Sequence, residues 1–165
     1  MNDTFVSQVE EFAKPANVFC ELIEVHNTYS MHNFLYELAK VLSELYYSGL
    51  TLPEVESVSS EAILSFVTTK ERIEIQQAIG TKLGAYNLYL EIFNPYVHGE
   101  PITGNIGDDL TDIYSDIKNG LAMFKKGNEL DIAEAIWHWR FSFYSHFSNH
   151  LVSALRVINH ILMDE

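Results

Sequence analysis

Side chains able to do chemistry gather near the carboxyl end of the chain. His146 and His150 stand four positions apart within residues 133–163, a segment that contains neither proline nor glycine. This segment is predicted to form one long helix, on which a spacing of four places both imidazoles on the same side, about 40° apart. Two histidines at this spacing can bind one metal ion when a carboxylate from a neighbouring element joins them.

Three aspartates could supply that carboxylate. Asp109, Asp112 and Asp116 stand at steps of three and four, so a helix over residues 108–125 would carry them on a strip about 60° wide. The short turn at residues 126–128 predicts that this helix and the last one run antiparallel. The contacts expected from that register are Asp116 with residues 138–140, Asp112 with residues 140–143, and Asp109 with His146.

An arginine interrupts the apolar face of the last helix. Arg140 falls between Trp137 and Tyr144, and the face continues through Leu151, Leu155, Ile158 and Leu162. A guanidinium on a core face must reach solvent, line a polar cavity or meet an acid. The register above therefore predicts that Arg140 pairs with Asp112 or Asp116.

These residues define one candidate ligand-binding cluster between the last two helices. Its members are Asp109, Asp112, Asp116, Arg140, His146 and His150. The favoured interpretation is a structural network that holds the two helices together, because buried charges persist in proteins when they are paired. A second interpretation is a divalent metal site with His146, His150 and Asp109 as ligands, and a third is acid–base catalysis by His146.

The elements that must position this cluster are helices. Apolar residues at three- and four-residue steps predict helices over residues 5–23 and 31–49, with a kink or break at Pro15 and with Ser30 as the cap of the second. A capping box from Thr68 to Glu71 predicts a third helix. This helix should weaken at Gly80 and Gly84 and resume through Tyr86, Leu90 and Phe93, and no strand-type alternation of any length is seen. The fold class is therefore all-α: an up-and-down bundle of five or more helices, in one domain over residues 1–165.

Composition limits the functions that this chain can have. Its net charge of −13, from 23 acids against 10 bases, disfavours nucleic acids and anionic membranes as partners. No apolar run approaches the roughly 20 residues of a membrane span, and the amino terminus lacks the features of a signal peptide. With a single cysteine, Cys20, these features predict a cytoplasmic protein whose partners are another protein or a small ligand.

Known catalytic motifs are largely missing. The sequence has no Glu-x-x-His pair, no His-Glu-x-x-His helix, no glycine-rich phosphate loop and no Gly-x-Ser-x-Gly elbow. Glu21, Glu24 and Glu37 are spaced like part of the magnesium site of helical nucleotide pyrophosphohydrolases. Lys40 stands where that site requires a fourth acid, and a lysine there would repel the metal.

The chain resembles an uncharacterised family over nearly its whole length. The segments that carry the resemblance are residues 12–13, 19–24, 108–121 and 139–141, the histidines at 146 and 150, and residues 154–156, and the Asp-Asp-Leu-x-Asp-Ile-Tyr block at 108–114 is the most specific. The family is domain of unknown function 5063, and Phe147-Ser148 departs from its usual Trp-Gly pair. The resemblance implies an all-helical bacterial domain and no particular activity. We therefore expect a binding or interaction module, and the alternative is a metal-dependent, hydrolase-like enzyme that uses the Asp/His cluster.

Overall fold

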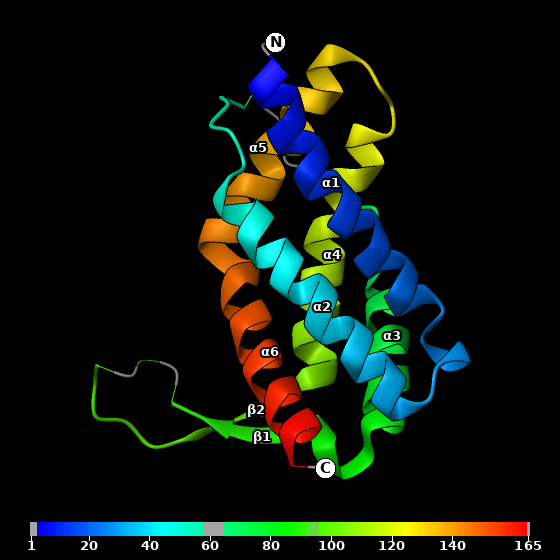
Figure 1. Cartoon of the computed structure of the whole chain (residues 1–165), viewed down its shortest axis with the longest axis vertical. Coiled ribbons are helices and arrows are strands. Elements are labelled where there is room, and N and C mark those ends of the chain that lie inside the picture. Colours follow the sequence, from blue (N-terminus) through cyan, green and yellow to red (C-terminus); the bar gives the residue numbers. More distant parts are fainter. Residues whose placement is uncertain (1–2, 58–64, 93, 95, 165) are drawn as a thin grey trace.

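Helices run up and down along the long axis of the molecule (Figure 1). A computed structural model describes residues 3–57, 65–92, 94 and 96–164. Within these residues the α-helices are α1 (Asp3–Glu24), α2 (Met31–Leu50), α3 (Thr69–Leu83), α4 (Ile106–Phe124), α5 (Glu129–Ser142) and α6 (Ser148–Met163). The predicted all-α bundle is confirmed. No helix in the described part of the chain is both long enough and apolar enough to cross a membrane.

α4 is the central helix of the bundle. It contacts α1, α3, α5 and α6, and its apolar stripe is buried: Ile106, Leu110, Ile113, Ile117 and Leu121 are at most 1% exposed. The aspartates of α4 therefore lie beside a fully covered stripe, where neighbouring helices can reach them.

The helices α2 and α3 begin where the sequence predicts. The Ser30 side chain accepts a hydrogen bond from the amide of Asn33 at the start of α2, and Thr68 and Glu71 form the capping box of α3. Pro15 lies inside α1, which continues through it without the predicted break.

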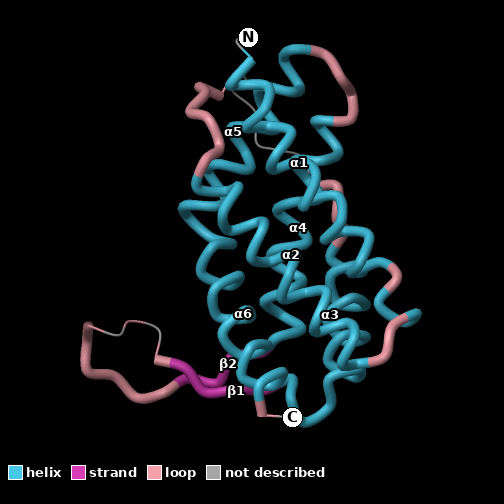
Figure 2. The backbone as a smooth tube through the Cα atoms, in the orientation of Figure 1, coloured by secondary structure: helices cyan, strands magenta, loops and turns pink. Residues whose placement is uncertain are grey.

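A β-hairpin replaces the helix that was predicted to resume after Gly84. Strands β1 (Leu88–Glu91) and β2 (Ile102–Asn105) pair antiparallel and project from one end of the bundle (Figure 2). Gly84 ends α3 with a positive φ of 55°, a conformation that stops helix propagation. Leu88 and Leu90 are then exposed while Tyr89 and Glu91 are half-buried, which is the alternation of a strand. The prediction that Tyr86 and Leu90 continue a helix is wrong, and Phe93 lies outside the described residues.

The predicted long helix at the carboxyl end is present but contains a π turn. Helical structure continues from α5 to α6 through residues Phe143–Phe147, which form a π-helical turn. In such a turn each hydrogen bond joins residues five positions apart, in place of the four of an α-helix. The wider turn rotates the face that meets the core. Its buried apolar residues are Trp139, Phe143, Phe147, Leu151, Ala154, Ile158 and Ile161. The predicted core face is confirmed at Leu151 and Ile158 but is wrong at Trp137, which is half-buried, and at Tyr144, which is 55% exposed.

Candidate metal centre

A line of carboxylates on α4 lies between α6 and α3. The side chains of Asp109, Asp112 and Asp116 are only 9%, 14% and 18% exposed. The helix begins immediately before them, where the Asn105 side chain accepts a hydrogen bond from the amide of Asp108 at 3.1 Å and fixes the first turn. One flank of a buried helix therefore presents three carboxylates to the neighbouring elements.

Two of these carboxylates hold the two histidines. Nδ1 of His146 lies 2.8 Å from Oδ2 of Asp116, and Nδ1 of His150 lies 2.8 Å from Oδ1 of Asp109. Ionised carboxylates only accept hydrogen bonds, so Nδ1 of each ring must be the donor. In the neutral imidazole this leaves the lone pair on Nε2, which is the form in which histidine binds metals.

The pairing of histidines and aspartates differs from the predicted register. Near the start of the last helix the register is right, because His138 lies 3.1 Å from the carbonyl oxygen of Asp116. His146 lies within the π turn, where the chain has advanced less along α4 than the register predicts, and its predicted contact with Asp109 is wrong. His146 meets Asp116 instead, and His150 takes Asp109.

Asp112 lies opposite the free edges of both imidazoles. Its Oδ2 atom is 3.5 Å from Nε2 of His150 and 4.0 Å from Nε2 of His146. Both separations exceed the 2.7–3.2 Å typical of a hydrogen bond. The rings themselves are close, with centroids 4.9 Å apart. Among the described residues, Asp112, His146 and His150 are the group of side chains whose ligand atoms lie close enough together to share a metal ion, all within 4.8 Å of one another.

An arginine from α3 orients the central aspartate. Nη2 of Arg72 donates to Oδ1 of Asp112, and Nη1 donates to Oγ of Ser115 at 2.6 Å. This fork leaves Oδ2 of Asp112 to face the histidines. The sequence prediction missed Arg72, because only the packing of α3 against α4 brings it here and no motif marks it.

A tyrosine from the hairpin orients the buried aspartate. The hydroxyl of Tyr89 donates to Oδ2 of Asp109 at 2.6 Å, and Gly104 lies opposite Tyr89 in the two-stranded sheet. A Cβ atom at Gly104 would come within 2.3 Å of the tyrosine ring, so the glycine makes room for it. Burial raises the pKa of the Tyr89 hydroxyl, and the hydrogen bond to Asp109 raises it further.

Negative charge is in excess around the cluster. The pKa of Asp108 is raised by burial and by the nearby charges of Asp112 and Asp109, which indicates crowding of like charges. The pKa of His150 is raised chiefly by its hydrogen bond to Asp109. Arg72 is the arginine that pairs with this group, through Asp112, and the carboxylates together attract positive charge, whether a proton on His150 or a bound cation.

Arg140 is the one predicted member that the structure keeps apart from this cluster. Its Nη1 donates to the carbonyl oxygen of Leu52 at 3.0 Å, its Nη2 lies 3.8 Å from Oε2 of Glu54, and its guanidinium covers the ring of Tyr144. The predicted ion pair with Asp112 or Asp116 is therefore wrong. Because Trp139, and not Arg140, points into the core, the arginine lies at the side of α5 that faces residues 52–54.

Comparison with known proteins places the chain in a family. A family model described as domain of unknown function DUF5063 matches residues 3–164. The chain belongs to this family. The fold of this DUF5063 protein is similar to the crystal structure of protein BF1032 from Bacteroides fragilis, with 25% sequence identity and a TM-score of 0.84 over 93% of this chain and 91% of that one. No curated protein matches the chain.

Two glutamates of the acidic pattern on the first two helices of this DUF5063 protein are already paired with lysines. Glu24 accepts hydrogen bonds from Nζ of Lys118 and from the hydroxyl of Tyr114, and Glu37 accepts one from Nζ of Lys40 at 2.6 Å. These ion pairs already satisfy two of the acids that the pyrophosphohydrolase pattern would need. The Asp/His cluster, formed by α4, the π turn at Phe143–Phe147 and α6, is thus the better candidate site.

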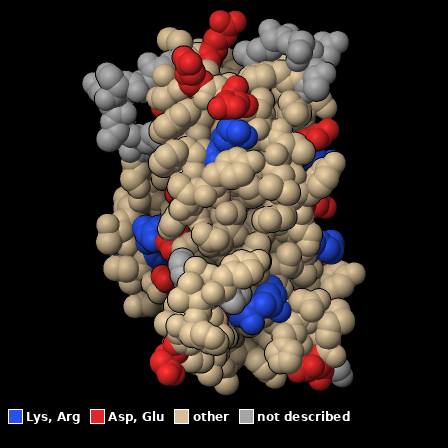
Figure 3. All heavy atoms as spheres, turned by 90° about the vertical axis from the view of Figure 1, so that its left-hand side faces the viewer, with Lys and Arg blue, Asp and Glu red and all other residues tan. Residues whose placement is uncertain are grey.

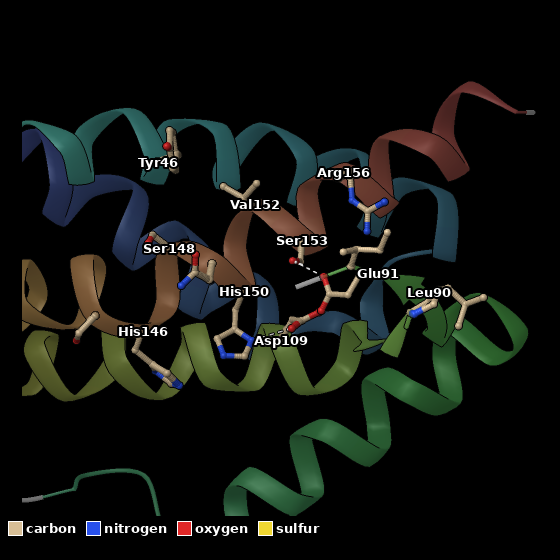
Figure 4. A pocket seen from close by; sticks show the side chains of 14 residues that line it. Tyr46, Leu90, Glu91, Asp109, His146, Ser148, His150, Val152, Ser153 and Arg156 are labelled. Carbon is tan, nitrogen blue, oxygen red and sulfur yellow. Dashed lines mark hydrogen bonds and ion pairs between the residues drawn. The ribbon is translucent and has the colours of Figure 1, made fainter. Parts of the chain in front are cut away.

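The cluster of this DUF5063 protein borders a groove of about 890 Å³. His146, His150 and Asp109 line the groove together with residues of α2, α6 and the segment from β1 to β2. Figure 4 shows both imidazoles between α6 and α4, with Arg156 further along α6. On this side of the molecule basic and acidic side chains are scattered over a mostly uncharged surface, without an extended basic patch (Figure 3). A small molecule could therefore reach the cluster from the groove.

Proposed function

We propose that this protein binds one divalent transition-metal ion of the zinc type through Nε2 of His146, Nε2 of His150 and Oδ2 of Asp112. One observation carries the proposal. Both histidines give their Nδ1 hydrogen to a carboxylate, while their Nε2 atoms converge on Oδ2 of Asp112 without a hydrogen bond. Metal-binding histidines typically donate their second ring nitrogen to a carboxylate in this way.

The distances support a tetrahedral ion. Zinc bound at about 2.1 Å to nitrogen and oxygen ligands holds those ligands about 3.4 Å apart. Nε2 of His150 and Oδ2 of Asp112 are 3.5 Å apart, which is already this separation. Nε2 of His146 is 4.0 Å from Oδ2 of Asp112, so its side chain, 48% exposed, would have to move about 0.6 Å closer to Asp112.

The number of protein ligands bears on the role of the ion. Structural zinc sites are filled by four protein ligands, whereas catalytic sites have three and keep a position for water or substrate. Three ligands, of which His146 and His150 line the groove, support a site that presents the ion to a small molecule. Hydrolysis is the reaction class that such an ion would support, because bound water ionises near neutral pH. A protein partner, a bacterial source and a cytoplasmic location stay predictions from the sequence.

Metal titration of the purified chain tests the proposal. We expect the metal-free wild-type protein to bind one equivalent of Zn²⁺ in calorimetry, and His146→Ala to bind it far more weakly. His160→Ala is the matched control, because this exposed histidine lies further along the same continuous helical segment and pairs with Asp164, away from the cluster. Wild-type protein that binds no Zn²⁺, or a His146→Ala variant that binds it as well as the control does, would contradict the proposal.

A further inference from the structure

The groove beside the proposed metal site contains an arginine that is available to an anion. Arg156 lines the groove and is exposed. Its guanidinium lies over the ring of Tyr89, 5.9 Å from the centroid, and within the described residues it forms no ion pair with a carboxylate. The chain has 23 acids and 10 bases, so a basic side chain without a carboxylate partner is unexpected.

Tyr89 connects this arginine to the proposed metal site. The ring of Tyr89 supports the guanidinium, while its hydroxyl donates to Oδ2 of Asp109, and Asp109 in turn holds His150. A single side chain from β1 therefore positions both ends of the groove. A cation–π contact of this kind favours one place for an arginine and leaves its hydrogen-bond donors available.

Polar and apolar side chains both line the groove. Asn149, Ser153 and Arg156 lie at steps of four and three on α6, so they share one face of that helix, and all three line the groove. The apolar walls come from Leu90, Ile92, Val152 and Pro101. From His150 to Arg156 the helix advances by about 9 Å, which is the length of a small ligand and not of a polymer.

An acid in the same groove restricts where an anion can bind. Glu91 lines the groove, and its Oε2 atom accepts a hydrogen bond from Oγ of Ser153 at 2.8 Å. Figure 4 shows this pair between His150 and Arg156. A negative group in the middle of the groove would be repelled, whereas one at its far end would meet the guanidinium.

We propose that the groove binds a small ligand with two ends: a group that coordinates the metal beside His150, and a carboxylate or phosphate that binds Arg156. This inference rests on the proposed metal site and adds the chemical class of its ligand. Arginine pairs with both anions through two parallel hydrogen bonds, so the two sources share one recognition chemistry. The apolar walls would contact the hydrocarbon between the ends.

Hydroxamates with different tails can test the anion subsite separately from the metal. The hydroxamate group chelates zinc, so a series of alkyl hydroxamates ending in a methyl group, a carboxylate or a phosphonate probes both ends of the groove. With Zn²⁺-loaded protein, we expect an anionic tail of matching length to tighten binding by about tenfold over the methyl tail, as for one charge-assisted hydrogen bond. The stronger of the two anionic tails identifies the source of the anion.

Variants then assign that advantage to one residue. Arg156→Gln should remove the advantage of the anionic tail and leave the methyl-tailed probe unaffected. Arg140→Ala is the matched control, since Arg140 pairs with Glu54 away from the groove. It should keep the full advantage.

Each failure has its own signature. If anionic and methyl tails bind the zinc-loaded protein equally well at every chain length, or if Arg156→Gln keeps the advantage, the anion subsite is refuted and the metal site stands. If no probe binds although calorimetry shows bound Zn²⁺, or if probe binding does not depend on Zn²⁺, the two-ended ligand is refuted and the metal site stands; if the protein binds no Zn²⁺, both are refuted.

Discussion

The carboxylates behind the histidines provide a graded test of the site. Asp116→Asn and Asp109→Asn keep the size of each side chain and remove the charge that holds Nδ1 of His146 or of His150. No proposed metal ligand is altered. Losing such a carboxylate typically weakens metal binding by about 10–100-fold, because the imidazole is less well oriented and less basic.

Burial decides where each variant falls in that range. The His146 and Asp116 side chains are 48% and 18% exposed, so water can replace part of the lost interaction and a loss of about tenfold is expected. The His150 and Asp109 side chains are 28% and 9% exposed, and Tyr89 also donates to Asp109. Asp109→Asn should therefore approach the 100-fold end of the range.

Competition with a chromophoric chelator measures these affinities. Each variant is titrated with Zn²⁺ in the presence of the chelator, after circular dichroism has established that it is folded. Asp164→Asn, which alters an exposed aspartate paired with His160, is the control and should match the wild type. Affinities of Asp109→Asn and Asp116→Asn equal to that of the control would refute the proposed role of the two carboxylates.

Three further predictions concern stability. Gly120→Ala should lower the free energy of unfolding by about 1–3 kcal/mol in denaturant titration, because the new Cβ would come within 2.0 Å of the buried Trp139 indole; an unchanged midpoint would show that the indole yields freely. Arg140→Ala should lower the free energy of unfolding by less than about 1 kcal/mol, since its ionic partner is an exposed glutamate. A larger loss would mean that Arg140 contributes more than an exposed ion pair does. Burial lowers the pKa of His138 despite the nearby charge of Asp116. Below about pH 6.5 the unfolded chain therefore takes up a proton that the folded chain does not, and stability falls as the pH falls. His138→Asn should reduce this acid sensitivity in melting curves, and an identical pH profile would count against it.

Helical periodicity was sufficient to predict most of the bundle. The stripes on α2 and α4 are buried as expected, and the caps at Ser30 and Thr68 are present. Each of these rests on contacts within a few residues of sequence. The hairpin was missed because strands of four residues alternate too briefly to be distinguished from a weak helix, and because pairing across ten intervening residues leaves no local signal.

Sequence spacing predicts which residues belong to the site, whereas the contacts between them depend on how the helices and the hairpin pack. The steps between the aspartates of α4, and between His146 and His150, place these residues on common faces. Which histidine meets which aspartate depends on the π turn at residues 143–147. No proline or glycine in the sequence marks the position of this turn. Arg72 and Tyr89 reach the aspartates from other elements, and no helical repeat encodes such contacts.

The most direct test of the metal site is a crystal structure of the protein grown with Zn²⁺, in which anomalous scattering at the zinc edge locates the ion. The account predicts one ion bound by Nε2 of His146, Nε2 of His150 and Oδ2 of Asp112 at about 2.0–2.2 Å, with Asp116 and Asp109 still hydrogen-bonded to the two Nδ1 atoms. Crystals that contain no ion between these three side chains, or that contain zinc only elsewhere on the protein, would contradict it.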